Sequence, residues 1–182
     1  FDFDDSYYKG VQYDVAYTLV SALMTVEGSV SFSRIHACLV NDLEIAKLLK
    51  ACTDIRLKSR LQKLLSTPKH IREQNYMGLI TQLAPFAEGE VAELVNGPKA
   101  GRDILCLSEV VLSNTSTQVT VILLPTLKYQ ILGKQLGRML LQELAGLIGE
   151  RSSLGGSKAR FFSVYLDEFS AFAYEGFEQI LN

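Results

Sequence analysis

The spacing of hydrophobic residues changes about halfway along this chain, and that change constrains the fold more than any other feature. From about Val11 to Leu94, apolar residues recur at the three- and four-residue intervals of amphipathic helices. Further along, short runs of β-branched and apolar residues replace that pattern, most clearly at residues 118–124. Between them, Asn96-Gly97-Pro98 combines residues that end helices and begin turns. We therefore expect two structurally different parts.

The first part is predicted to be an all-α helical bundle over residues 1–97, with residues 1–10 as an entry segment. Asn41 and Asp54 each stand just before an apolar-periodic run. Their side chains can accept hydrogen bonds from the free amides at the start of a helix, so we expect a helix to begin after each. A last, short helix is expected from about Pro85 to Val95.

The second part, residues 98–182, is predicted to be α/β. Residues 118–124 and 161–166 are typical of strands covered on both faces. Residues 131–148 between them have helical spacing, while residues 104–112 fit a strand or a helix equally well. Strand, helical crossover and strand make the βαβ unit of a parallel sheet. The predicted fold class is therefore α/β with an inserted all-α domain: a helical bundle followed by part of a parallel sheet.

Composition excludes several classes of protein. With 182 residues, of which 48% are hydrophobic, the chain can bury a core and is not expected to be disordered. No apolar run approaches the roughly 20 residues that span a bilayer. The three cysteines fit no metal or disulfide pattern, which favours a reducing compartment. Because the chain begins at Phe1 without a Met or a signal pattern, we interpret it as an excised piece of a longer protein.

The strongest candidate for chemistry is the acidic pair Asp167-Glu168, which follows the predicted strand at residues 161–166. The carboxyl end of a parallel strand opens onto the ligand crevice of a sheet. An Asp there can hold the water shell of Mg²⁺, and a Glu beside it can orient the water that attacks a γ-phosphate. These are the roles of a Walker B motif. The alternative is an acidic turn at the end of a strand.

Two blocks of this sequence resemble the conjugative coupling proteins of type IV secretion, the TraD and TraG family. The first is similar to that family's strand, Leu-Pro-x-Leu turn and crossover helix, and the second to its Walker B region. The matching residues are 121–127 and 136–144, then 164–173 and 177–182. The helical segment before Gly97 stands where the family inserts its all-alpha domain, which makes that likeness architectural.

The resemblance implies part of a RecA-like P-loop ATPase that works as a homo-hexamer at the cytoplasmic face of the bacterial inner membrane. Such a motor couples relaxase-bound DNA or effector substrates to a type IV secretion channel. Asp167 corresponds to the metal-side carboxylate, holding Mg²⁺ through water, and Glu168 to the catalytic glutamate. ATP and Mg²⁺ are the implied cofactors of the intact protein. This chain itself is expected to contact no membrane.

The sequence departs from the family in one respect: it contains no Gly-x-x-x-x-Gly-Lys-Ser/Thr loop. Gly133 to Gly137 lies in a helical pattern, and Gly155 to Lys158 has the wrong spacing. Without the backbone amides and the lysine of that loop, the chain lacks the groups that hold the phosphates. We therefore expect it to bind ATP poorly and to hydrolyse almost none by itself.

A run of basic residues in the helical part is the candidate surface for DNA or for relaxosome proteins. Only one acid, Asp54, interrupts it. Such a surface can neutralise phosphates without reading sequence, and the resemblance implies the same partners for the all-alpha domain. The alternative is a solvated helix face. The eight residues are Lys47, Lys50, Arg56, Lys58, Arg60, Lys63, Lys69 and Arg72.

Two other functions remain open from the sequence. One is a different RecA-like or AAA-type motor whose helical insertion serves another substrate. The other is a non-enzymatic helical adaptor, in which Asp167 and Glu168 form only a turn.

Overall fold

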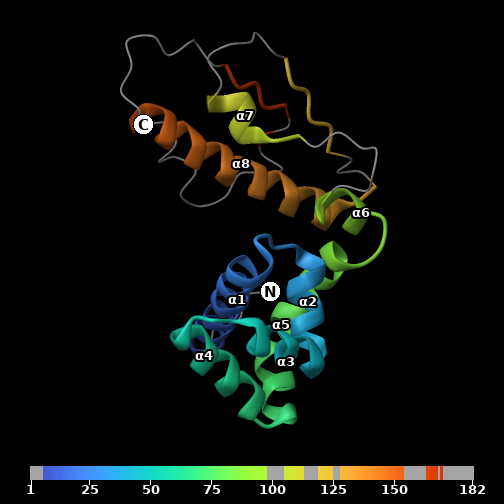
Figure 1. The fold of residues 1–182 in the computed structure, drawn as a ribbon. Helices are drawn as coiled ribbons and strands as arrows, with labels where there is room; N and C mark the ends of the chain where they lie inside the picture. The colour runs from blue at the N-terminus through green and yellow to red at the C-terminus, as the bar shows by residue number, and fades with distance from the viewer. Residues whose placement is uncertain are drawn as a thin grey trace. The chain divides into compact units, whose positions relative to one another are not determined.

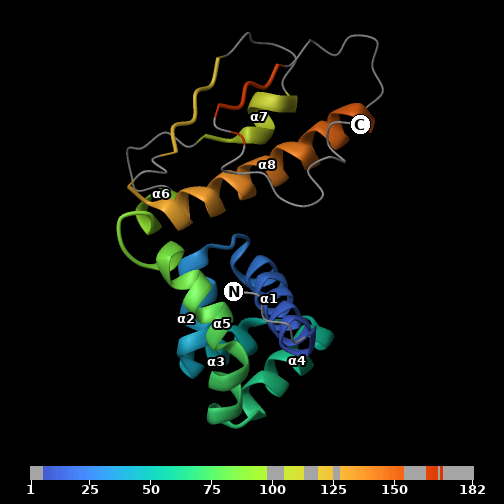
Figure 2. The ribbon, with the colours of Figure 1, turned by 180° about the vertical axis from the view of Figure 1, so that it is seen from behind.

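The computed structural model describes residues 6–97, 105–112, 119–124, 128–153, 163–167 and 169. The chain divides into two compact units, Phe1–Asp103 and Ile104–Asn182. The division falls shortly after the boundary that the sequence predicts between residues 97 and 98. Figures 1 and 2 show the helices of each unit from opposite sides.

The described residues of unit 1 form a bundle of helices. α2 packs against α3 and α5, α4 packs against α1 and α3, and α1 also contacts α5. The helices are α1 (Ser6–Glu27), α2 (Phe32–Val40), α3 (Asp42–Ala51), α4 (Ile55–Ser66), α5 (Lys69–Ala87) and α6 (Ala92–Val95). The all-helical character predicted for this part of the chain is confirmed.

Both predicted helix starts are confirmed. The side chain of Asn41 caps α3 by accepting a hydrogen bond from the amide of Leu43 at 3.0 Å. Asp54 caps α4, where its Oδ1 accepts the amides of Arg56 at 2.8 Å and Leu57 at 2.9 Å. These bonds satisfy donors that have no partner within the helix, which is why each helix begins where it does.

A glycine ends α1. Gly28 has φ of 71°, a conformation that other residues adopt at a cost, and its amide donates to the carbonyl of Met24 at 3.1 Å.

None of the described helices is by itself long and apolar enough to cross a membrane. The pair Tyr8–Glu27 and Phe32–Val40, bent by 114°, meets that criterion by length and composition only.

The short helix predicted from Pro85 to Val95 has the right end but the wrong start, because α6 covers only Ala92–Val95. Pro85 lies inside the last turn of α5, and Gly89, with φ of 85°, separates α5 from α6. Tertiary contacts hold that last turn against the tendency of proline to end a helix. Asn96 donates to the carbonyl of Phe86 at 2.6 Å, and the hydroxyl of Ser33 donates to that of Ala87 at 2.8 Å.

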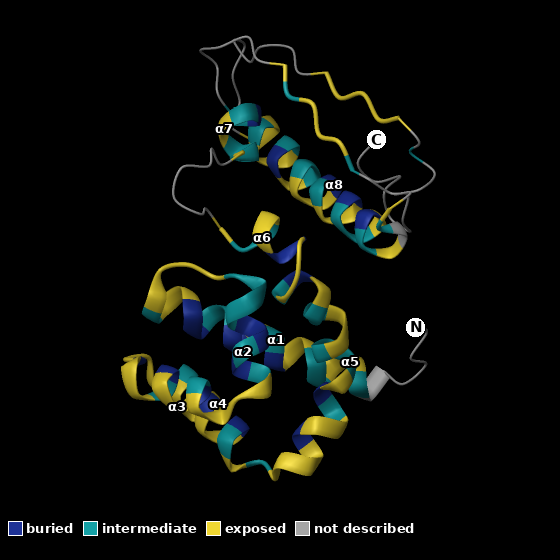
Figure 3. Ribbon diagram, turned by 90° about the vertical axis from the view of Figure 1, so that its right-hand side faces the viewer, coloured by how far each residue is buried: buried dark blue, intermediate teal, exposed yellow. Residues whose placement is uncertain are grey.

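The core of unit 1 draws on five helices. Figure 3 shows its buried residues on the inward sides of the helices, with exposed residues outside. The buried side chains include Val15, Leu19, Ala22 and Leu23 of α1, Ile35 and Cys38 of α2, Ile45 and Leu48 of α3, Leu61 and Leu64 of α4, and Tyr76 of α5, joined by Cys52. α1 and α4, which both contribute to this core, also pack against each other.

In the described residues of unit 2, a short helix packs on a long one. α7 (Leu107–Leu112) contacts α8 (Gln130–Ser153), and Val111 of α7 is fully buried. The guanidinium of Arg151 donates to the carbonyl of Val111. The helix predicted at residues 131–148 is confirmed. The ambiguous segment before residue 112 is helical from Leu107 on.

The predicted fold class, α/β with a parallel RecA-like sheet, is wrong: every regular element among the described residues is a helix. Residues 119–124 and 163–166 form neither helix nor strand. Most of their side chains, which the pattern placed inside a sheet, are exposed: Val119 is 87% exposed and Tyr165 is 91% exposed. Residues 118, 161 and 162, also assigned to the two strands, lie outside the described residues.

The physical reason is that an apolar, β-branched run becomes a strand only beside a partner. β-propensity mostly measures how a side chain packs on a pleated surface, so it contributes little where no neighbouring strand supplies that surface. Helices satisfy their backbone hydrogen bonds internally, which is why α8 forms where the two flanking runs do not.

Candidate nucleic-acid interface

The eight basic residues lie on three helices of unit 1, and the structure divides them by their partners. Lys47 and Lys50 belong to α3, the next four to α4, and Lys69 and Arg72 to α5. Seven are exposed and one, Arg72, is buried. A cation contributes most to phosphate binding when no internal acid already neutralises it, so the partners decide which residues form an interface.

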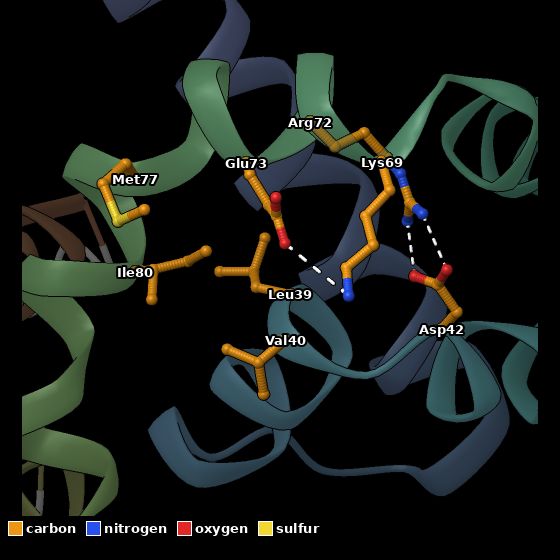
Figure 4. A pocket seen from close by; sticks show the side chains of 8 residues that line it. All are labelled: Leu39, Val40, Asp42, Lys69, Arg72, Glu73, Met77 and Ile80. Atoms are coloured by element: carbon orange, nitrogen blue, oxygen red, sulfur yellow. Dashed lines mark hydrogen bonds and ion pairs between the residues drawn. The ribbon is translucent and has the colours of Figure 1, made fainter.

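Arg72 is a structural residue. Its guanidinium donates to both carboxylate oxygens of Asp42, at 2.6 and 2.7 Å, and its side chain is only 8% exposed (Figure 4). The hydrogen bonds to Asp42 raise the pKa of Arg72 above its usual value, and the same bonds lower the pKa of Asp42. The pair joins α5 to the first turn of α3, and its geometry leaves no open face for a phosphate.

Two lysines form pairs within their own helices. Lys47 donates to Glu44 at 2.6 Å, three residues before it in α3. Lys69 lies 3.7 Å from Glu73, four residues after it in α5. Exposed pairs of this kind are weak and exchange readily with other ions. These lysines add less net positive potential than an unpaired lysine does.

The remaining exposed cations of α3 and α4 have no ion pair with any described residue. They are Lys50, Arg56, Lys58 and Lys63. The capping carboxylate of Asp54, close to Arg56 in sequence, already accepts two backbone amides. We call these four residues the free basic cluster.

Arg60 contacts residues of α1 that the sequence analysis does not identify as part of an interface. It forms an ion pair with Asp14 at 3.2 Å, and its guanidinium lies over the ring of Tyr17, 5.9 Å from the centroid. That ring stacks with Tyr13, with centroids 6.5 Å apart and planes at 18°. Both tyrosines are open to solvent: Tyr13 is 74% exposed and Tyr17 is 56% exposed.

A pocket of about 210 Å³ lies between the end of α2, the start of α3 and α5. Figure 4 shows Lys69 reaching toward Glu73, and Arg72 toward Asp42, beside apolar side chains. The apolar lining residues are Leu39, Val40, Met77 and Ile80. Both cations at this pocket are paired within the protein, so the pocket is a poorer anion site than the free basic cluster.

Of the predicted metal and catalytic residues, Asp167 is exposed, and Glu168 lies outside the described residues. In the part of the chain that the structure describes, no three His, Cys, Asp or Glu side chains gather as metal ligands do. The segment from Gly133 to Gly137 lies inside α8, so it is not a phosphate-binding loop. The Mg²⁺ and ATP roles of Asp167 and Glu168 therefore remain predictions.

Known proteins do not assign this chain to a family. Comparisons with family models, with curated proteins and with solved structures find no match. Any function assigned to the chain therefore depends on its own residues and on the resemblance of its two sequence blocks.

Proposed function

We propose that this chain is part of a coupling-protein-like, DNA-translocating ATPase, and that its helical unit 1 contacts DNA through phosphates. The observation that supports the contact is the free basic cluster of Lys50, Arg56, Lys58 and Lys63, whose charges no described acid neutralises. Binding of this kind positions a strand without reading its sequence, which suits a motor that moves any DNA. Relaxosome proteins are the other proposed partners of this unit.

The test is a salt titration of DNA binding by the 182-residue chain. If the four cations of the cluster each neutralise one phosphate, the slope of log K against log salt should be about −3 for single strands. Replacing all four with Gln should flatten the slope and abolish measurable binding at physiological salt. Replacing the internally paired Lys47 and Lys69 with Gln is the matched control and should change the slope less. Equal slopes in the two variants would refute the assignment.

The nucleotide part of the proposal depends on the resemblance of residues 164–173 and 177–182. In this proposal Asp167 holds the Mg²⁺ ion through water, and Glu168 orients the water that attacks the γ-phosphate. It also makes the working protein an ATP-consuming homo-hexamer at a type IV secretion channel, on the cytoplasmic face of the bacterial inner membrane. The test is ATPase turnover of the full-length cytoplasmic protein, with and without single-stranded DNA, in wild type and Glu168→Gln. Lost turnover with retained ATP binding supports the role; unchanged turnover excludes it.

A non-enzymatic helical adaptor is the second candidate function. The observation that favours it is that all regular elements among the described residues are helices, with Asp167 exposed outside them. An adaptor should tolerate Asp167→Ala and Glu168→Ala in the full-length protein without loss of transport. A motor should lose transport in both variants, so the same two substitutions separate the candidates.

A further inference from the structure

The outer side of α1 carries a pair of aromatic rings in solvent. Tyr13 and Tyr17 are one helical turn apart, on the side opposite Val15 and Leu19, which are buried in the core. Their rings are nearly parallel, and at least half of each side chain is open to water. A tyrosine ring exposes a large apolar face, which favours contact with another flat ring.

The neighbouring side of α4 carries a stripe of cations. Arg56, Arg60 and Lys63 stand at positions i, i+4 and i+7, a spacing that places them along one side of a helix. Leu61 and Leu64 are buried on another side. By the same helical geometry, Lys58 belongs to the flank away from this stripe.

Arg60 brings the rings and the stripe together. Besides its contacts with Asp14 and the ring of Tyr17, its guanidinium reaches the hydroxyl of Thr18 at 3.4 Å. α1 and α4 pack against each other, and Figures 1 and 2 both show them as neighbours. The tyrosines and the stripe therefore share one surface, although 42 residues lie between Tyr17 and Arg60 in the sequence.

The charge of this surface is positive. Lys9, one turn before Tyr13 on α1, is exposed and adds a cation beside the tyrosines. Asp14 forms an ion pair with Arg60 at 3.2 Å, and the same guanidinium lies 5.9 Å from the centre of the Tyr17 ring. Because Asp14 is 65% exposed, water and salt screen this ion pair, and an incoming phosphate can compete for the guanidinium.

We propose that this surface binds single-stranded nucleic acid, with bases stacked on Tyr13 and Tyr17 and phosphates held by Arg56, Arg60 and Lys63. The inference depends on the proposed contact between unit 1 and nucleic acid, and it specifies the form of the strand. Aromatic platforms beside a cationic stripe are the usual means of holding single strands, because every base has a face that can stack. A duplex keeps those faces inside, so it can use only the cations.

The experiment measures fluorescence anisotropy of a labelled oligothymidylate of about 16 nucleotides, the upper end of common site sizes. The 182-residue chain is titrated against it, against an abasic strand of the same length and against a hairpin duplex. The variants are Tyr13→Leu/Tyr17→Leu and, as the conservative control, Tyr13→Phe/Tyr17→Phe. Lys63→Glu is compared with Lys69→Glu, an identical charge change at an exposed lysine of α5 that already pairs with Glu73.

The leucine variant should bind oligothymidylate about tenfold or more weakly and the abasic strand as wild type does, because only stacking is lost. The phenylalanine variant should retain binding, since the ring remains. Lys63→Glu should weaken binding to every probe more than Lys69→Glu does. Far-UV circular dichroism and thermal unfolding check that each variant is folded, which is expected because the altered side chains are exposed.

Two results would overturn the inference, and they differ in what else they refute. Binding to DNA that ignores the tyrosine substitutions, or that is equally strong for the abasic strand, refutes stacking and leaves the phosphate contact standing. No binding to any of the three probes refutes both the inference and the proposed DNA contact.

Discussion

Arg72 buries its guanidinium beside a carboxylate that is itself half in solvent, that of Asp42. The side chain of Arg72 is 8% exposed and that of Asp42 is 52% exposed, with two hydrogen bonds of 2.6 and 2.7 Å between them. The Nε of Arg72 is buried without a hydrogen-bond partner. The cost of breaking the pair therefore depends on which partner is removed, because water can replace the partner of Asp42 more easily than that of Arg72.

The first prediction follows from this asymmetry. Asp42→Ala should lower the free energy of unfolding by about 2–3 kcal/mol, because it leaves a buried guanidinium unpaired and removes an acid from the first turn of α3. Arg72→Met should cost less than about 1 kcal/mol, since an apolar chain of similar length fills the site and Asp42 becomes hydrated. Urea unfolding measures both. The double variant should resemble Arg72→Met, and equal costs for the two single variants would contradict this account.

The second prediction concerns acid. The hydrogen bonds from Arg72 lower the pKa of Asp42 in the folded state. A depressed pKa stabilises the fold at every pH above the unfolded value, about 3.9, and this contribution is lost as the pH falls through the folded pKa. The free energy of unfolding should therefore fall less between neutral pH and about pH 3 in Asp42→Ala than in wild type. Parallel pH profiles for the two proteins would argue against the pair.

The third prediction concerns the cysteines. Burial raises the pKa of Cys38 to about 11, whereas a hydrogen bond with the hydroxyl of Ser108 lowers that of Cys106. The thiolate is the reactive form, so iodoacetamide at mildly alkaline pH should alkylate Cys106 first. Cys38 and Cys52, both buried, should react only on unfolding. Mass spectrometry of timed samples measures the order. Ser108→Ala should slow the modification of Cys106 and leave that of the other two unchanged.

The fourth prediction concerns the cap of α4. Asp54→Ala removes the acceptor for the amides of Arg56 and Leu57 and should cost about 1 kcal/mol of stability. Asp54→Ser, which keeps a capping oxygen but no charge, should recover most of that loss. Thr53→Ala, at the exposed neighbouring position, is the matched control for a change in the same loop. Equal unfolding midpoints for Asp54→Ala and wild type would contradict the capping role.

What the sequence could predict was local. Asn41 and Asp54 begin helices because their acceptors reach amides only two or three residues away, and α8 follows from a period within a single segment. The predicted strands failed because a strand is defined by a neighbour, and a run such as residues 119–124 does not specify one. Its apolar side chains are compatible with a sheet but do not require it.

The candidate interface was only half predictable. The basic run is visible in the sequence, but which of its cations stay free depends on acids elsewhere in the chain, such as Asp42 for Arg72 and Asp14 for Arg60. Tyr13 and Tyr17 could have been found, since both fall opposite the apolar stripe of α1 through Val15 and Leu19. Their placement beside α4 comes from packing, which no local pattern encodes.

Asn96 anchors the last described turn of unit 1. Asn96 accepts the amide of Ser33 at 2.7 Å and donates to the carbonyls of Phe86 at 2.6 Å and Ala92 at 2.8 Å. It thereby ties α2, α5 and α6 together at one point. A force applied to the chain after residue 97 acts on these three helices at once. Unit 1 should therefore unfold cooperatively under force, and its helices should not unfold one at a time.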